Sequence, residues 1–257
     1  MELVFKLIVC LIAGIGAGLG TGFAGMSAAA VISPILITFL GMSAYSAVGI
    51  ALASDVLASA VSTYSYWKNK NLDIKNGIIM MIAVLIFTMI GSYVASLVPN
   101  QVMGNFSVFM TILLGIKFII KPVMTTKDNM EKNSKNRGLK SIVSGSLIGF
   151  ICGFVGAGGG LMMLLVLTSV LGYELKTAVG TSVFIMTFTA LTGSVSHFAI
   201  GGIEDIGALI ACIISTFIFA KLASGFANKA KPETLNRVTG VILVVIGAAI
   251  LLVNYIK

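Results

Sequence analysis

The chain of 257 residues is 58% hydrophobic and only 10% charged, and its mean hydropathy is +1.06. A soluble domain carries about 25% charged residues and less than about 50% apolar ones, so these values exclude a soluble globular protein and indicate a multi-span membrane protein. The net charge of +8 comes from basic residues placed between apolar segments. The positive-inside rule accounts for that placement, and we expect no nucleic acid among the partners.

Ten apolar segments follow one another along the chain. They cover residues 3–22, 28–40, 44–67, 77–98, 104–120, 141–157, 160–171, 177–198, 206–225 and 238–255. Eight approach the roughly 20 residues that a membrane-spanning helix needs. The segments 28–40 and 160–171 are shorter, and each directly follows a glycine-rich patch. The first segment lacks a convincing cleavage site and is predicted to be a retained span.

The two halves of the chain share a sequence pattern. A shift of 131 positions aligns residues 18–49 with 149–180 without a gap and gives ten identities in 32 positions. Equivalent loops differ in charge: 68–76 is basic where 199–206 is not, and 226–237 is basic where 99–103 is uncharged. Basic loops stay in the cytoplasm, so equivalent loops are predicted on opposite sides of the membrane.

This pattern predicts an all-α polytopic membrane protein built from two inverted repeats of about five helical segments each. The repeats are residues 1–120 and 141–257, with eight near-full spans and two short helices after the glycine-rich breaks. Residues 121–140 form a basic linker that is expected to be cytoplasmic, and both termini are then external.

Motifs in the second half resemble those of the TauE/SafE family, the sulfite exporter or TSUP permeases. They are the run GFVGAGGG at 153–160, the apolar segment after it, and LGYELKTAVGTS at 171–182. The first half keeps the proline of the family's short helix as Pro34, where the second half has Leu165. The first half also departs from the family pattern, because it has GFAGMSAAA where the second half has the glycine run, and AVGIA where the second half has AVGTS. The resemblance covers nearly the whole chain. It implies a secondary transporter in the cytoplasmic membrane that moves a small anion, such as sulfite, sulfoacetate or another organosulfonate. The predicted inverted repeat around broken helices favours alternating access.

Glycine at membrane depth suggests the substrate site. Irregular backbone is tolerated there only inside protein or along a wet cavity, and a helix N-terminus offers free N–H donors to an anion. We therefore expect Gly156, Gly158, Gly159 and Gly160 to form an anion cradle, with Gly25 and Ser27 as a weaker version in the first half. Close helix packing is the alternative, above all for Gly149 and Gly153.

Four further polar residues lie inside apolar segments. Thr181 and Ser182 either donate hydroxyls to an oxyanion or bond back to their own helix. Asp55 is the acidic residue in the middle of segment 44–67, and a carboxylate there suggests a proton-coupling group, with a structural hydrogen bond as the alternative. His197, near a segment end, is expected to be solvated or to cap the helix.

The sequence favours no enzyme class. It has no HExxH motif and no paired carboxylates within a span, and Cys10, Cys152 and Cys212 are too scattered for a metal cluster. We expect no cofactor and no metal, with a small anion and the lipid bilayer as partners. An anion channel or a non-transporting structural membrane protein stays as the alternative function, and a homo-oligomer is left open.

Overall fold

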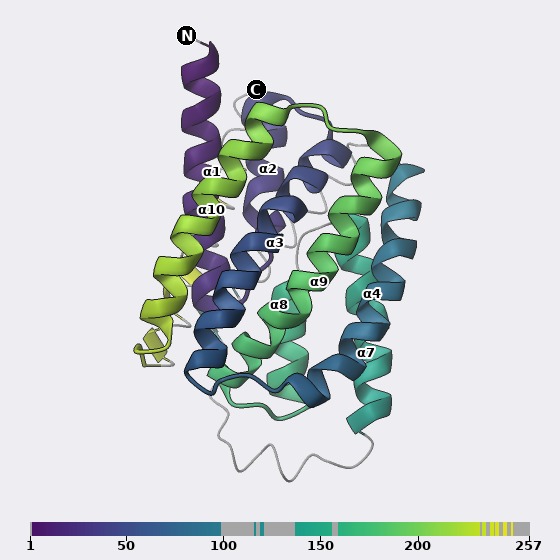
Figure 1. The fold of residues 1–257 in the computed structure, drawn as a ribbon, viewed down its shortest axis with the longest axis vertical. Coiled ribbons are helices and arrows are strands. Elements are labelled where there is room, and N and C mark those ends of the chain that lie inside the picture. The colour runs from purple at the N-terminus through teal and green to yellow at the C-terminus, as the bar shows by residue number, and fades with distance from the viewer. Residues whose placement is uncertain are drawn as a thin grey trace.

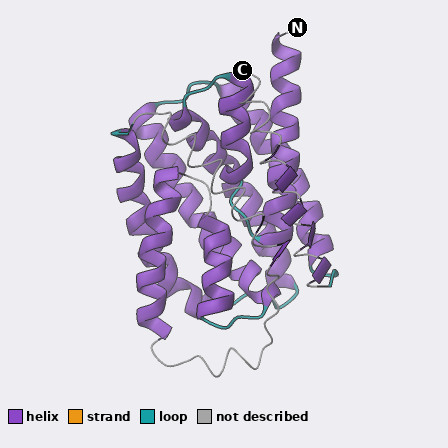
Figure 2. Ribbon diagram, turned by 180° about the vertical axis from the view of Figure 1, so that it is seen from behind, coloured by secondary structure: helices purple, strands orange, loops and turns teal. Residues whose placement is uncertain are grey.

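The computed structural model describes residues 2–98, 137–155 and 159–231, together with isolated positions within 116–120 and 233–248. The described part consists of helices and connecting loops and contains no strand (Figure 1, Figure 2), which confirms the all-helical class. Its elements are α1 (Glu2–Ala24), α2 (Ala29–Leu40), α3 (Ala44–Lys68), α4 (Ile74–Ser96), α7 (Arg137–Val155), α8 (Gly159–Leu165), the π-helical turn η1 (Val166–Val170), α9 (Leu175–Gly201) and α10 (Ile206–Ala227).

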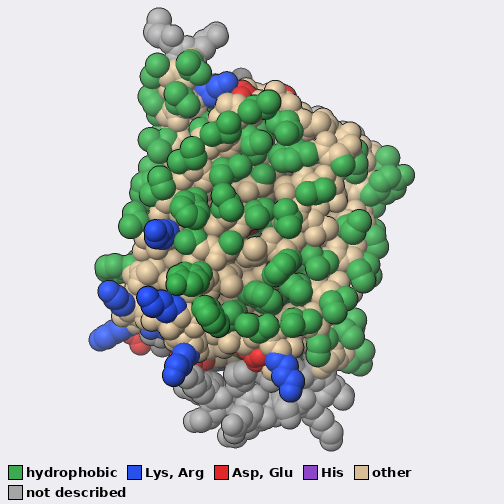
Figure 3. Space-filling view, viewed as in Figure 1, with side chains coloured by type: hydrophobic (Ala, Val, Ile, Leu, Met, Phe, Trp, Pro, Cys, Tyr) green, Lys and Arg blue, Asp and Glu red, His purple; other side chains and the backbone are tan. Residues whose placement is uncertain are grey.

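Five of these helices are long and apolar enough to cross a membrane, namely α1, α3, α4, α9 and α10. Helices α2 and α7 are apolar but shorter. Apolar side chains cover much of the face seen in Figure 3, as expected for a surface that meets lipid. Of the eight predicted spans, 141–157 corresponds to the shorter α7, while 104–120 and 238–255 fall almost wholly outside the described residues.

Both predicted short segments are helices that follow a break. Four residues separate the end of α1 from the start of α2, and α8 with η1 covers 159–170, close to the predicted 160–171. The two halves therefore repeat one order of elements: α1, α2, α3 and α4 correspond to α7, α8 with η1, α9 and α10.

Packing between the halves is reciprocal. Helix α1 packs against α10, and its counterpart α7 packs against α4; α3 and α9 pack on each other, and each also contacts the fourth helix of the other half. In Figure 1, α1, α3 and α10 run downward, whereas α7, α9 and α4 run upward. Corresponding helices thus point in opposite directions.

Glycines make the closest helix contacts, as the packing interpretation of Gly149 and Gly153 predicts. A methyl group on Gly149 would overlap the Val84 carbonyl oxygen of α4, and one on Gly153 would overlap that of Thr88. At the equivalent positions of α1, a methyl on Gly18 would lie 2.6 Å from the Thr216 carbonyl oxygen of α10. Four-residue spacing of glycines lets two backbones approach within a membrane.

Charge separates the two ends of the molecule. The loop between α3 and α4, with Lys70, and the residues after α10, with Lys229, lie at the lower end of Figure 1, where Figure 3 shows Lys and Arg gathered. An Asn71–Asn228 side-chain hydrogen bond of 2.9 Å joins these two segments. We call this the basic end.

The opposite end holds the loop between α9 and α10 (Figure 1). There Lys6 Nζ lies 2.8 Å from Asp205 Oδ2, and this ion-paired hydrogen bond holds the pKa of Asp205 below its ordinary value. Asp205 also caps α10, because its Oδ1 accepts a hydrogen bond from the Ala208 N–H.

Substituting Gly149→Ala should destabilise the protein by about 1–3 kcal/mol, because the added methyl group meets backbone atoms of α4 that cannot rotate away. Gly225→Ala is the matched control: it lies in α10 with nothing within 4 Å of the new methyl group, so the change should be neutral or stabilising by up to ~1 kcal/mol. Thermal unfolding of both purified variants in one detergent measures the difference. Equal melting temperatures would contradict close packing at Gly149.

Candidate functional site

The break between α1 and α2 is a tight, buried turn. Gly25 has φ +62°, a left-handed conformation that glycine adopts without strain. Its N–H donates to the Thr21 carbonyl, and the Met26 N–H donates to that of Gly20, which together cap the end of α1. The turn residues Met26, Ser27 and Ala28 are fully buried, so the chain reverses inside the protein and not in lipid.

Asp55 of α3 faces this turn. Its side chain is fully buried, and Oδ1 accepts a 2.9 Å hydrogen bond from the Ser59 hydroxyl. The Ser27 side chain, the Ala28 N–H and the Thr21 hydroxyl point at the same carboxyl group. The carboxyl of Asp55 therefore lies at the N-terminus of α2, where backbone donors and the helix dipole favour a negative charge.

Ser182 of α9 connects the two breaks. Its hydroxyl lies 3.3 Å from the Gly25 carbonyl oxygen and 3.2 Å from that of Gly160, at the start of α8. A methyl group on Gly160 would overlap the Gly25 carbonyl oxygen and would lie 2.7 Å from both Ser27 N and Met186 Sδ. The turn of the first half and the start of α8 in the second half are thus in direct contact.

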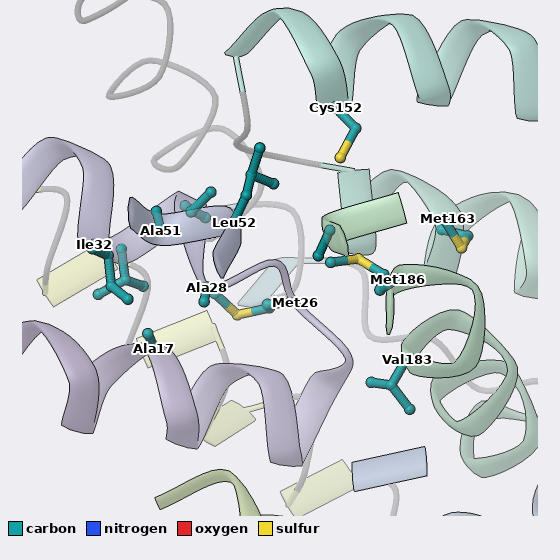
Figure 4. Packing of buried hydrophobic residues seen from close by; sticks show 14 of the residues in the cluster. Ala17, Met26, Ala28, Ile32, Ala51, Leu52, Cys152, Met163, Val183 and Met186 are labelled. Carbon is teal, nitrogen blue, oxygen red and sulfur yellow. The ribbon is translucent and has the colours of Figure 1, made fainter. Parts of the chain in front are cut away.

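The second half lacks an acid at the position that corresponds to Asp55. Met186 stands there, 131 residues further on, and its sulfur lies beside Gly160. Cys152 stands where the first half has Thr21, and it packs against Gly159. Figure 4 shows Met26, Ala28, Met186 and Cys152 in this part of the core. Polar groups therefore surround the first break, and sulfur-containing side chains pack against Gly159 and Gly160 at the start of α8.

The other predicted site residues lie as follows. The hydroxyl of Thr181 accepts a 3.1 Å hydrogen bond from the Asp73 N–H near the basic end, away from the breaks. Neither Thr181 nor Ser182 is seen bonded to its own helix. Gly156 and Gly158 lie outside the described residues. Gly159 and Gly160 are buried, Gly159 against Cys152 and Gly160 against the first break.

The expectation for His197 is wrong. Its side chain is buried, its ring stacks on Tyr45 of α3 with centroids 4.4 Å apart, and Nδ1 lies 3.0 Å from the Gly193 carbonyl oxygen. Helix α9 continues to Gly201, which places His197 inside the helix and facing α3.

Sequence reasoning missed four polar residues near Asp55: Thr21, Ser59, Ser62 and Tyr66, all fully buried. The last three recur at spacings of four, seven and eleven residues from Asp55, so they share one face of α3. A polar face of this kind in an apolar span is a signal that the sequence itself contains.

The geometry and composition together define a multi-pass, all-helical membrane protein. The chain matches the family model described as sulfite exporter TauE/SafE over residues 10–250, and it therefore belongs to that family. This membership confirms the predicted resemblance and makes the protein a membrane transporter, as its relatives are also named.

Three of those relatives are described as probable membrane transporter proteins. YunE of Bacillus subtilis is 26% identical to this chain, and the match covers 98% of both sequences. MJ0441 of Methanocaldococcus jannaschii is 27% identical over 80% of this chain and 79% of its own, and YdhB of B. subtilis is 20% identical over 82% and 86%. No solved structure is significantly similar to the chain.

Substituting Ser182→Ala should destabilise the protein by about 1–3 kcal/mol, because two buried carbonyl oxygens lose the donor that they share. Ser54→Ala is the control: Ser54 is equally buried, but its hydroxyl bonds only to the Ile50 carbonyl of its own helix. Thermal unfolding should show a clearly larger loss for Ser182→Ala. A loss no larger than that of Ser54→Ala would mean that the bridge between the breaks contributes little.

Proposed function

We propose that this protein is a secondary transporter that moves a small anion across the cytoplasmic membrane and couples the movement to protons through Asp55. The observation that carries the proposal is the position of the Asp55 carboxyl at the buried N-terminus of α2, among the Thr21, Ser27, Ala28 and Ser59 donors. The Asp55 carboxyl group already occupies the kind of place that a substrate anion would seek.

Competition for these donors gives a physical basis for coupling. An ionised Asp55 accepts hydrogen bonds from the turn and repels a second anion, whereas a protonated Asp55 loses its charge and binds the same donors less strongly. Protonation thereby frees the Ser27 and Ala28 donors for a substrate. The proton and the anion then enter together, and the buried site never holds two uncompensated negative charges.

The substrate that we propose is a sulfur oxyanion or an organosulfonate. Its oxygens accept several hydrogen bonds at once, which suits a site of hydroxyl and backbone donors without a buried cation. The family description, sulfite exporter, supports this class. We place the anion where the breaks meet, at Gly25 and Ser27 of the first half and at Gly159, Gly160 and Ser182 of the second, with Gly156 and Gly158 in the same glycine run. The Thr181 hydroxyl does not join this site, because it points to the Asp73 N–H.

We propose that the two halves are inverted repeats that rock around this site, with the basic end in the cytoplasm. The reciprocal packing and the opposite directions of corresponding helices support the inversion. The lysines of the basic end support the orientation. A site of interrupted helices between inverted halves suits alternating access.

The Asp55→Asn variant should bind the anion but lose most of the pH dependence of transport, because asparagine mimics the neutral carboxyl at every pH. In the wild type, affinity should rise as the pH falls and Asp55 is protonated. The measurement is flux of a labelled alkyl sulfonate into proteoliposomes, since a sulfonate stays ionised throughout and does not titrate itself. Asp55→Glu, which keeps an ionisable group, should retain a pH-dependent flux. If Asp55→Asn keeps the wild-type pH profile, Asp55 has a structural role only.

Inversion predicts that two cysteine variants react with a membrane-impermeant thiol reagent from opposite faces of the membrane. They are Lys68→Cys, at the end of α3, and Ile203→Cys, in the loop before α10. Both positions are exposed, and the native Cys10, Cys152 and Cys212 are buried, so background labelling should be low. Labelling of both variants from one face would refute the inverted arrangement.

A further inference from the structure

A stripe of buried polar side chains runs along α3 from Asp55 toward the basic end. Asp55, Ser59, Ser62 and Tyr66 are all fully buried and share one face of the helix. Eleven residues of α-helix span about 16 Å, roughly half of the ~30 Å hydrocarbon core. The stripe thus extends from the middle of the membrane to the end of the helix.

Ser62 differs from Ser54 and Thr63 of the same helix. Ser54 and Thr63 bond back to the Ile50 and Ser59 carbonyl oxygens of their own helix, the usual arrangement in an apolar span. Ser62 Oγ has no hydrogen-bond partner among the described residues. A buried hydroxyl is costly when unpaired, so an unpaired one within a polar stripe points to a transient partner such as water or a proton carrier.

The stripe has polar groups at both of its ends. Near the middle, no described group completes a hydrogen bond with Thr21 Oγ1 or Asp55 Oδ2, although the Thr21 hydroxyl faces the carboxyl group. At the other end, the Tyr66 hydroxyl lies 3.1 Å from the Gly22 carbonyl oxygen, and Asn228 Nδ2 lies 3.3 Å from Ser65 Oγ. Between Ala44 and Ala53, by contrast, every fully buried side chain of α3 is apolar or glycine.

We propose that Asp55 exchanges its proton with the basic end along this stripe, through Ser62 and Ser59. This inference rests on the proposed function, because it assigns the route by which the coupling proton arrives. A proton from water at the basic end binds the oxygen of Ser62 as its own proton leaves, directly or through water, for Ser59, which delivers its hydroxyl proton to the Asp55 carboxylate. Each serine ends as a neutral hydroxyl, and only Asp55 has gained a proton.

The surroundings of Asp55 leave few other groups to carry this proton. The groups that face its carboxyl are Thr21 of α1, Ser27 and Ala28 of the turn and Ser59 of α3. In the described part of the chain, the Cys152 thiol of α7 is the other titratable group that senses its charge, and burial among Gly159 and neighbouring side chains separates it from water.

The test uses full-length protein in proteoliposomes loaded with a pH-sensitive dye, with a gradient of an alkyl sulfonate to drive proton movement. Ser62→Ala should slow sulfonate-driven proton entry about tenfold, because the route loses one of its relay hydroxyls. Sulfonate affinity, measured by a binding titration, should stay unchanged. Ser62→Thr, which restores a hydroxyl, should recover most of the rate, and Ser59→Ala should be slow as well.

Ser54→Ala is the control, because it removes an equally buried hydroxyl from the same helix outside the stripe. If Ser62→Ala moves protons as fast as Ser54→Ala while Asp55→Asn moves none, the route is refuted and the proposed function stands. If the wild type moves no protons with the sulfonate, proton coupling itself fails. A rate lost in Ser62→Ala and not recovered in Ser62→Thr would indicate a packing defect and would also overturn the route.

Discussion

A helix that breaks inside a membrane must satisfy its freed backbone groups within the protein, and this structure depends on that constraint. At the first break, the N–H groups of Gly25 and Met26 donate hydrogen bonds to carbonyl oxygens at the end of α1. The Gly25 carbonyl oxygen accepts a hydrogen bond from the Ser182 hydroxyl of the other half. The donors at the start of α2 face Asp55. Each of these partners is a side chain or a backbone group of the protein itself.

The two halves share a scaffold but differ in chemistry at the break. Asp55, Thr21 and Tyr66 of the first half correspond to Met186, Cys152 and His197 of the second. Ser182 in turn corresponds to Ala51. The acid and its polar stripe therefore belong to α3, while the hydroxyl that joins the breaks belongs to α9. Two halves with the same order of helices but different polar side chains can place a buried acid and a bridging hydroxyl close together.

Much of the scaffold was predictable from sequence, because span length, glycine spacing and loop charge are local properties. The short helices after the breaks and the close packing at Gly149 and Gly153 follow from such patterns. The contacts of Ser182 with Gly25 and Gly160 join residues from three elements, so no local pattern reveals them. The prediction for His197 was wrong for a related reason. Hydropathy locates the end of a helix only approximately, and α9 continues for about one turn beyond the predicted segment, so that His197 is buried and not solvated.

The bridge at Ser182 limits how the two halves can move. One hydroxyl has a single proton to share between two carbonyl oxygens at 3.2 and 3.3 Å, so each bond is long and weak. A net hydrogen bond contributes about 0.5–1.5 kcal/mol, which the binding of one charged ligand readily offsets. Because Gly160 also lies against the Gly25 carbonyl and Ser27 N, a shift of the first break displaces the start of α8. A ligand that took donors from Asp55 would therefore act on contacts that belong to both halves at once, because those contacts are weak enough to exchange.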